Sequence, residues 1–325
     1  MNNDLQERIG YHGDLSKLLS TVCKEYQIGT YVSHSAVLMG YEDFNLIVET
    51  THHKFFFKIF ASFRDRKNCE RYIEIIGAAR NAGISQPEIY ESSQGRLYET
   101  VIEDKQVRLC VMQYIDGQTL FESQTKLTGK EAIFLLKEAA LINKIPLEPE
   151  FIYDSWAIVH FLSVWEERKQ YLSVDDQKLI LPLVQPFQQF DLKVLPHCFV
   201  HGDLIKTNVM RDRNDKLYIL DFSVANYYPR IQELAVMLCD LLFDEQNLDL
   251  YDKVYKQALE EYQKYVPLEE VEIKTLPLYA QVAHAMHLLC ATYEKVVNHN
   301  DTKENEYFID LGRKGLRFTS RFFDN

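Results

Sequence analysis

Residues 199–222 carry the sequence FVHGDLIKTNVMRDRNDKLYILDF, the most informative stretch of the chain. A short apolar run leads into a polar loop, and two further apolar runs, at residues 209–210 and 217–220, flank a turn rich in polar residues. Polar turn residues between two apolar runs are typical of a hairpin. The stretch therefore predicts a strand, a loop and then a hairpin.

Three polar side chains stand at the edges of this unit. Asp203 opens the loop, Asn208 follows five residues later, and Asp221 ends the returning arm, so a tight hairpin brings Asp221 back beside Asn208. Oxygen ligands of this kind suit Mg²⁺, which keeps phosphates and waters for the rest of its octahedron. Phosphoryl transfer needs such a clamp and a carboxylate that receives the hydroxyl proton. The alternative is that Asp and Asn serve only turn chemistry.

The motif HGDLxxxN, followed by an apolar strand and DF, resembles the catalytic core of the aminoglycoside phosphotransferase, choline kinase and homoserine kinase superfamily, which shares the protein-kinase fold. The resemblance implies that Asp203 is the catalytic base and that Asn208 and Asp221 are the metal ligands. It also implies that His201 supports the loop and does not touch substrate. ATP and Mg²⁺ are the cofactors implied, and ATP is not distinguished from GTP.

The tetrapeptide HGDL occurs a second time, at residues 12–15. There, Leu19 stands where the motif needs Asn, and Val32 stands where it needs the second Asp. Asp14 instead precedes apolar residues at helical spacing, which predicts an N-cap of a helix over residues 14–27. The spaced triple, and not the tetrapeptide, therefore carries the functional prediction.

Composition limits the classes of function. The chain has 325 residues, 46% of them hydrophobic, and a formal net charge of −12. This length suits two lobes, and the negative charge argues against a general nucleic-acid binder. Six cysteines have no C-x-x-C spacing, and no apolar run reaches the ~18 residues of a membrane span. We expect a cytoplasmic protein with reduced thiols, no membrane partner and an oligomeric state left open.

The first part of the chain predicts an antiparallel sheet with strands at residues 31–38, 46–49, 55–60, 88–90, 97–102 and 108–114, and a helix over 64–82. Lys58 lies inside an almost wholly apolar strand, where a lysine is costly unless it meets an opposite charge or a phosphate. The resemblance implies a nucleotide-binding lysine. The alternative is a lysine that reaches water at a strand edge.

The resemblance also implies the rest of a nucleotide site. Gly40 begins a loop, GYEDFN, whose backbone would cradle phosphates. Glu70 stands where a helix glutamate would pair with Lys58, with Glu74 as an open alternative and solvated charges as another. Backbone groups of Gln113 and Ile115, at the end of the sheet, would contact the adenine edge.

Together these features predict an α+β, bilobal, protein-kinase-like fold. Residues 1–116 would form a small antiparallel-sheet nucleotide-binding lobe, and residues 117–325 a larger, mainly helical catalytic and substrate-binding lobe. Helices are predicted over 128–146, 153–172, 231–245, 248–265, 276–297 and 305–322. In the family, an Asp often stands where this chain has Glu233, so the role of that residue is left open.

The predicted function is an ATP-dependent phosphotransferase that moves the γ-phosphate to a hydroxyl of a small molecule such as an aminoglycoside, choline or homoserine. Alternatives are a catalytically inactive nucleotide-binding module and a protein kinase, although helix begins too soon after Asp221 for an activation loop. Lys206, three residues after Asp203, would stabilise the transferring phosphoryl group or else face solvent. Asp240, Asp244 and Glu245 would bind a cationic acceptor or else form a solvated acidic face.

Overall fold

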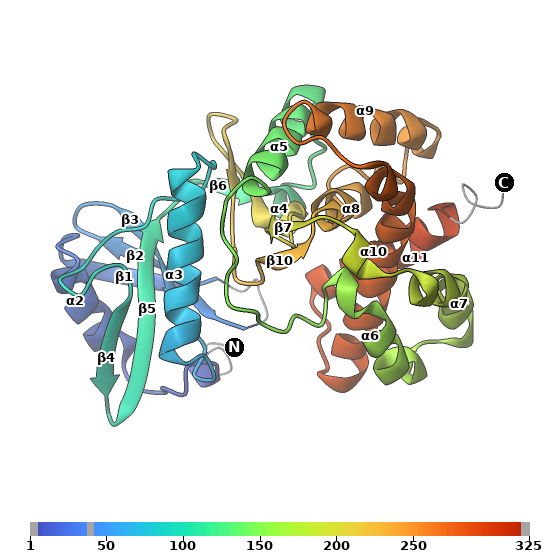
Figure 1. Ribbon diagram of the computed structural model, residues 1–325. Helices are drawn as coiled ribbons and strands as arrows, with labels where there is room; N and C mark the ends of the chain where they lie inside the picture. Colours follow the sequence, from blue (N-terminus) through green and yellow to red (C-terminus); the bar gives the residue numbers. More distant parts are fainter. Residues whose placement is uncertain (1–5, 38–41, 320–325) are drawn as a thin grey trace. The chain divides into compact units, whose positions relative to one another are not determined.

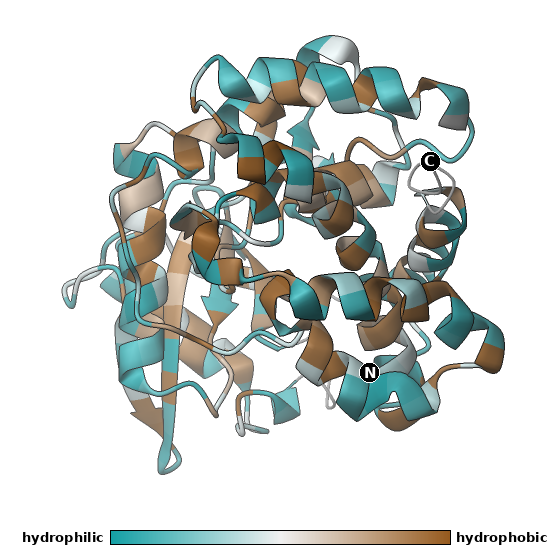
Figure 2. Ribbon diagram, turned by 45° about the vertical axis from the view of Figure 1, so that its right-hand side comes forward, coloured by the Kyte–Doolittle hydropathy of each residue, from teal (hydrophilic) through white to brown (hydrophobic). Residues whose placement is uncertain are grey.

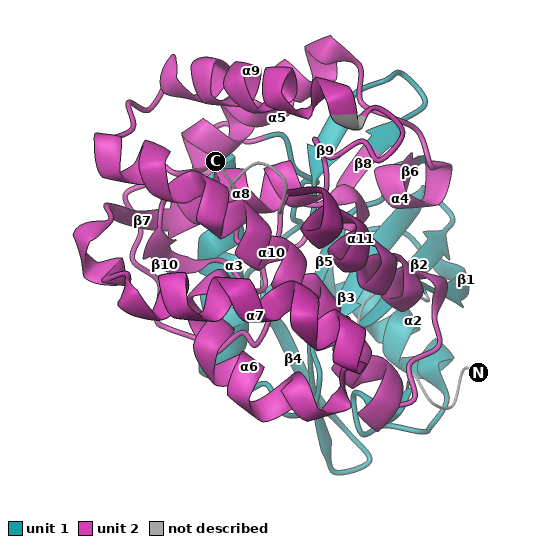
Figure 3. Cartoon of the chain, turned by 90° about the vertical axis from the view of Figure 1, so that its right-hand side faces the viewer, with its two compact units in different colours: residues 1–80, 85–117, 211–220 teal, residues 81–84, 118–210, 221–325 magenta. Residues whose placement is uncertain are grey.

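The computed structural model describes residues 6–37 and 42–319, except for the side chain of Leu248. The chain divides into two compact units (Figure 3). Unit 1 comprises residues 1–80, 85–117 and 211–220, and unit 2 comprises residues 81–84, 118–210 and 221–325. Unit 1 is built on a sheet and unit 2 is mainly helical, so the predicted fold class is confirmed.

A five-stranded antiparallel sheet forms the centre of unit 1 (Figure 1). Its order is β1-β2-β3-β5-β4. The strands are β1 (Tyr31–Ala36), β2 (Phe44–Thr50), β3 (Lys54–Ile59), β4 (Tyr98–Ile102) and β5 (Lys105–Gln113). Residues 88–90 contribute only an isolated bridge, from Ile89 to Met112, instead of the predicted strand.

The two faces of β3 contact different helices of unit 1. Phe55, Phe57 and Ile59 join the buried cluster that contains the apolar face of α2 (Leu15–Glu25). Because side chains alternate along a strand, Lys58 points to the other face, where its ammonium lies 5.1 Å from the ring centre of Tyr72 on α3 (Arg66–Asn81).

The N-cap prediction for α2 is confirmed. The Asp14 carboxylate accepts the N–H of Ser16 at 2.8 Å. The second HGDL tetrapeptide is therefore a helix start, as the spacing around it indicated.

A hairpin from the second half of the sequence also belongs, for the most part, to unit 1. β8 (Val209–Asp212) and β9 (Leu217–Ile219) form the hairpin predicted from the central motif, and residues 211–220 belong to the sheet unit. The sequence-based lobes placed this segment in the second lobe. Close packing explains the difference: a Cβ added to Gly117, at the start of β6 (Gly117–Thr119), would lie 2.2 Å from the carbonyl oxygen of Arg211.

Unit 2 is organised around the long, mostly buried helix α10 (Glu270–Val297). Helix α11 (Lys303–Thr319) packs closely on it, because Gly312 and Gly315 leave room for the backbone of His284 and its ring. Every residue of α8 (Ile231–Cys239) is buried. Figure 2 shows hydrophobic strands in the sheet, and surface helices with one hydrophobic and one hydrophilic face. The remaining helices are α4 (Leu120–Ser123), α5 (Gly129–Ile142), α6 (Phe161–Arg168), α7 (Val174–Gln189) and α9 (Tyr251–Gln263).

The helix predicted over residues 153–172 is wrong in its first part. Residues 149–157 are irregular, and α6 begins only at Phe161. Asp154 is the physical reason, since its carboxylate accepts the N–H of Trp156 at 2.9 Å and this local bond competes with the helix. No helix among the described residues is long and apolar enough to cross a bilayer.

We predict that Gly117→Ala destabilises the protein by about 1–3 kcal/mol, because the new methyl group forces the Arg211 backbone to move. Urea unfolding measures the change. Gly129→Ala is the matched control, since nothing lies within 4 Å of a Cβ added there. Equal stability of the two variants would show that the close packing at Gly117 has no energetic weight.

Candidate active site

The predicted catalytic loop leaves strand β7 (His197–Val200), which pairs with β10 (Asn226–Pro229) in unit 2. His201 is completely buried and its ring packs on Phe222, with ring centres 4.4 Å apart. Gly202 has a φ of +82°, a conformation that glycine adopts readily. The chain can therefore turn sharply here and bring Asp203 to the start of the loop.

Asn208 holds Asp203 with one side-chain amide. Its Nδ2 donates to the Asp203 carboxylate at 2.7 Å and to the Asp203 main-chain carbonyl at 3.0 Å. These bonds use the amide nitrogen and leave the Asn208 Oδ1 as an acceptor for a cation. The loop from Asp203 to Asn208 is thus closed by its own first and last residues.

The carboxylate of Asp203 sits in an unfavourable place for a negative charge. Burial, together with the charges of Asp154 and Asp221, raises its pKa to about 8. A pKa near the working pH suits a general base, because the group can both accept and release a proton there. Asp154 had not been singled out in the sequence.

Asp221 has a φ of +53°, a left-handed conformation that is costly for a residue other than glycine. Its Oδ1 accepts the N–H of Ser223 at 3.2 Å, a local turn that stabilises this backbone. Strained residues of this kind concentrate at functional sites. The strain is consistent with a carboxylate held in place for a ligand.

Asn208 and Asp221 supply a donor set that fits Mg²⁺. In the described part of the chain, no group of three or more His, Cys, Asp or Glu residues can hold a metal by itself. Mg²⁺ commonly takes one or two protein oxygens and completes its shell with phosphates and waters. An amide oxygen and one carboxylate are therefore sufficient for a metal that arrives with a nucleotide.

Glu233 supports the loop from behind. Its completely buried carboxylate accepts the backbone N–H of His201 at 2.6 Å and that of Gly202. The His201 Nδ1 in turn accepts the backbone N–H of Asp203 at 3.2 Å. The supporting place predicted for His201 matches this geometry, and the role left open for Glu233 is to hold the loop backbone.

In unit 1, Lys58 is buried and forms an ion pair with Asp43 at 2.9 Å. The same carboxylate accepts the Arg64 Nε and the Ala61 backbone N–H, each at 3.0 Å. Lys58 is therefore not a lysine that reaches water at a strand edge.

The expectation that Glu70 or Glu74 pairs with Lys58 is wrong. Glu70 is about half exposed and bonds to Arg66 one turn away, and Glu74 is also exposed. Both glutamates stand on the outer side of α3, whereas the buried side carries Tyr72 towards Lys58. A role of Glu70 in cofactor binding stays a prediction without this support.

The remaining nucleotide-site residues have mixed outcomes. Gly40 lies outside the described residues. The Gln113 N–H already donates to the Glu88 carbonyl at 2.7 Å, which leaves the Gln113 carbonyl for an adenine edge. Ile115 is buried just beyond the end of β5.

Lys206 makes contacts that the sequence did not reveal. Its ammonium donates to the Tyr307 hydroxyl at 3.0 Å and lies 3.2 Å from the buried Asp240 carboxylate. Asp240 also accepts the Lys206 backbone N–H at 3.1 Å and the Tyr307 O–H at 2.6 Å. Lys206 is thus anchored to α11, and a role on the transferring phosphoryl group stays a prediction.

Residues 34–271 of the chain match the phosphotransferase enzyme family, which is well over half of its length. The chain belongs to this family. Homoserine kinase from Parvibaculum lavamentivorans is 22% identical over 276 residues, and homoserine kinase from Agrobacterium fabrum is 21% identical over 272 residues. These alignments cover 84% and 83% of each chain, respectively.

Solved structures of small-molecule kinases share the fold. The microcompartment-associated aminopropanol kinase superposes with a TM-score of 0.71 at 13% identity, covering 94% of this chain and 97% of the other. Choline kinase from Streptococcus pneumoniae has a TM-score of 0.63 at 14% identity, with 93% and 99% covered. The predicted superfamily is confirmed, and the protein is a phosphotransferase.

We predict that Glu233→Gln gains stability relative to the wild type as pH rises. Burial raises the pKa of Glu233 to about 7, above the value of about 4.5 in an unfolded chain. The folded state therefore binds more protons, and this stability is present below the unfolded pKa and is lost as pH rises through the folded pKa. The relative gain between about pH 4 and about pH 8 is at most about 3 kcal/mol.

Urea unfolding of both proteins at the two pH values measures this gain. Glu260→Gln is the control, because Glu260 is an exposed glutamate on α9. A Glu233→Gln difference that stays constant with pH would contradict the raised pKa.

Proposed function

We propose that Asp203 accepts the proton of an acceptor hydroxyl while that oxygen attacks the γ-phosphorus of ATP. The new bond joins the acceptor oxygen to phosphorus, the bond to the β-γ bridging oxygen breaks, and ADP leaves with those electrons. The observation that carries the proposal is the Asn208 amide, which donates to the Asp203 carboxylate at 2.7 Å. This arrangement orients a basic carboxylate at the centre of a loop that is held rigid from both ends.

Asn208 and Asp221 would hold Mg²⁺, which when bound neutralises charge on the nucleotide phosphates. The Asn208 Oδ1 and the Asp221 carboxylate are the oxygens for this role. Lys58 is the residue we assign to the phosphates, and Gln113 and Ile115 are the backbone partners we assign to adenine.

The acceptor is a small hydroxylated molecule. Homoserine kinases among the relatives, and aminopropanol and choline kinases among the structural neighbours, support an alcohol acceptor. The negative charges of Asp154 and Glu304 around Asp203 favour an acceptor whose reacting end is neutral or cationic. The six free cysteines favour a cytoplasmic enzyme.

We expect Asp203→Ala and Asp221→Ala to fail in different ways. Loss of the base lowers kcat by on the order of 10²- to 10⁴-fold and leaves Mg·ATP affinity nearly unchanged. Loss of Asp221 also weakens Mg·ATP binding, because a metal ligand is removed. Calorimetry with Mg·AMP-PNP and an ADP-release assay over a panel of amino alcohols, hydroxy amino acids and aminoglycosides measure both effects.

Asp212→Ala serves as the matched control for these two substitutions, since this partly exposed aspartate caps the β8–β9 turn. It should leave Mg·ATP affinity unchanged. Equal loss of Mg·ATP affinity in the Asp203 and Asp221 variants would overturn the separation of their roles.

A further inference from the structure

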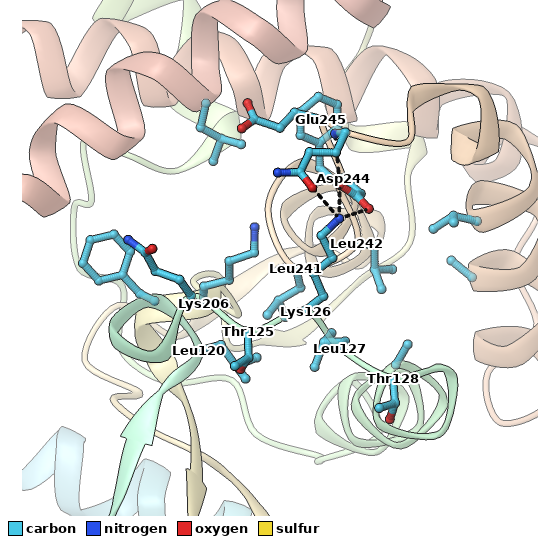
Figure 4. A pocket seen from close by; sticks show the side chains of 18 of the residues that line it. Leu120, Thr125, Lys126, Leu127, Thr128, Lys206, Leu241, Leu242, Asp244 and Glu245 are labelled. Carbon is cyan, nitrogen blue, oxygen red and sulfur yellow. Dashed lines mark hydrogen bonds and ion pairs between the residues drawn. The ribbon is translucent and has the colours of Figure 1, made fainter.

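A pocket of about 590 Å³ lies within unit 2 (Figure 4). Its walls come from α4, the start of α5, the turn after α8, α9 and α11, and Lys206 contributes from the catalytic loop. The volume falls in the range of sites that bind small organic ligands. None of the residues assigned to the nucleotide or the metal lines it.

Apolar side chains such as Leu120, Leu136, Leu241 and Leu311 form much of the lining. Lys206 brings a cation into this apolar space. An ammonium has three N–H donors, and the contacts to Tyr307 and Asp240 use two of them. One donor is left for a ligand.

The partner carboxylate of Lys206 does not face the pocket. Asp240 is completely buried and does not line it, whereas the Lys206 side chain is 24% exposed and does. The ion pair therefore presents its positive end to a ligand and keeps its negative end in the protein interior.

Two ion pairs stand at the rim. Lys126 binds Asp244 at 2.8 Å from one side, as Figure 4 shows, and Lys314 binds Glu245 at 2.7 Å from the other. All four side chains are a third or more exposed, so these pairs are weak and can exchange. Asp244 and Glu245, two of the acids predicted to bind a cationic acceptor, are thus paired with lysines. Of the three lysines in the pocket lining, Lys206 has the least exposed side chain.

The pocket shares one residue, Lys206, with the catalytic loop. Lys206 follows Asp203 by three residues, so their Cα atoms are at most ~11 Å apart. We infer that the pocket receives the non-reacting part of the acceptor, an apolar body with a carboxylate that Lys206 binds. This inference rests on the proposed function and narrows its substrate class to hydroxylated acids with an apolar extension.

Four probes test the two halves of this inference: N-acetylserine, N-octanoylserine and the primary amide of each. Calorimetry on the full-length protein measures their binding. The acid should bind about tenfold or more tightly than its amide, because a charge-assisted hydrogen bond is lost in the amide. The octanoyl acid should bind more tightly than the acetyl acid, by about tenfold for every two methylenes that become buried.

Two substitutions locate these preferences. Lys206→Met should abolish the preference for acid over amide, whereas Lys130→Met, at an exposed lysine on α5 that does not line the pocket, should retain it. Ile133→Trp, in the pocket wall, should abolish the advantage of the octanoyl chain. Thermal unfolding verifies that each variant is folded, and Gln257→Trp on the opposite wall replaces Ile133→Trp if that variant unfolds.

Equal binding of acid and amide to the wild type, or an acid preference that survives in Lys206→Met, would overturn the carboxylate assignment. An octanoyl advantage that survives in the folded tryptophan variant would overturn the pocket assignment. A different result would contradict the proposed function: the probes bind as described, yet the wild type phosphorylates no acceptor of any class. If the wild type phosphorylates acceptors, and Lys206→Met changes the binding of none of them, the proposed function stands and the inference is rejected.

Discussion

The bond from the Asn208 amide to Asp203 fixes the geometry on which the rest of the site depends. One N–H₂ group reaches both the carboxylate and the main-chain carbonyl of Asp203, so it sets the side chain and the backbone together. Glu233 then holds the preceding residues through the N–H groups of His201 and Gly202. Because hydrogen bonds hold the loop at both of its ends, the loop needs little reorganisation during the reaction.

The site concentrates negative charge in a chain that is already acidic. Burial raises the pKa values of Asp203 and Glu233, and each of these groups raises the cost of placing further anions nearby. Such a cluster is costly without a ligand, and the proposed Mg²⁺ and the hydrogen-bond donors of an acceptor would offset that cost. The acidic residues that destabilise the loop without a ligand would therefore favour the loop with a ligand bound.

Short-range order could be predicted from the sequence, and long-range pairing could not. Asp203 and Asn208 are five residues apart, and Asp14 caps a helix that begins at the next residue, so local spacing was sufficient. The link from Lys206 to Tyr307 spans 101 residues, and no pattern in the chain announces it.

Helix α7 was not predicted from the sequence, because prolines inside a segment normally argue against a helix. Pro182 and Pro186 signal a break, but they lie four residues apart on the exposed face. The carbonyl groups that lose their partners can therefore bond to water, and the helix continues.

The pairing of Lys58 with Asp43 is compatible with the phosphate role proposed for this buried lysine. A buried acid that loses its only counter-charge is strongly destabilising. Asp43, however, also accepts bonds from Arg64 and from the Ala61 N–H. If the Lys58 ammonium turned to a nucleotide phosphate, as proposed, these two donors would remain on the Asp43 carboxylate and the buried charge would keep partners. Asp43 thus takes the place beside Lys58 that the sequence analysis had assigned to a glutamate on α3, and Arg64 supplies Asp43 with a second counter-charge.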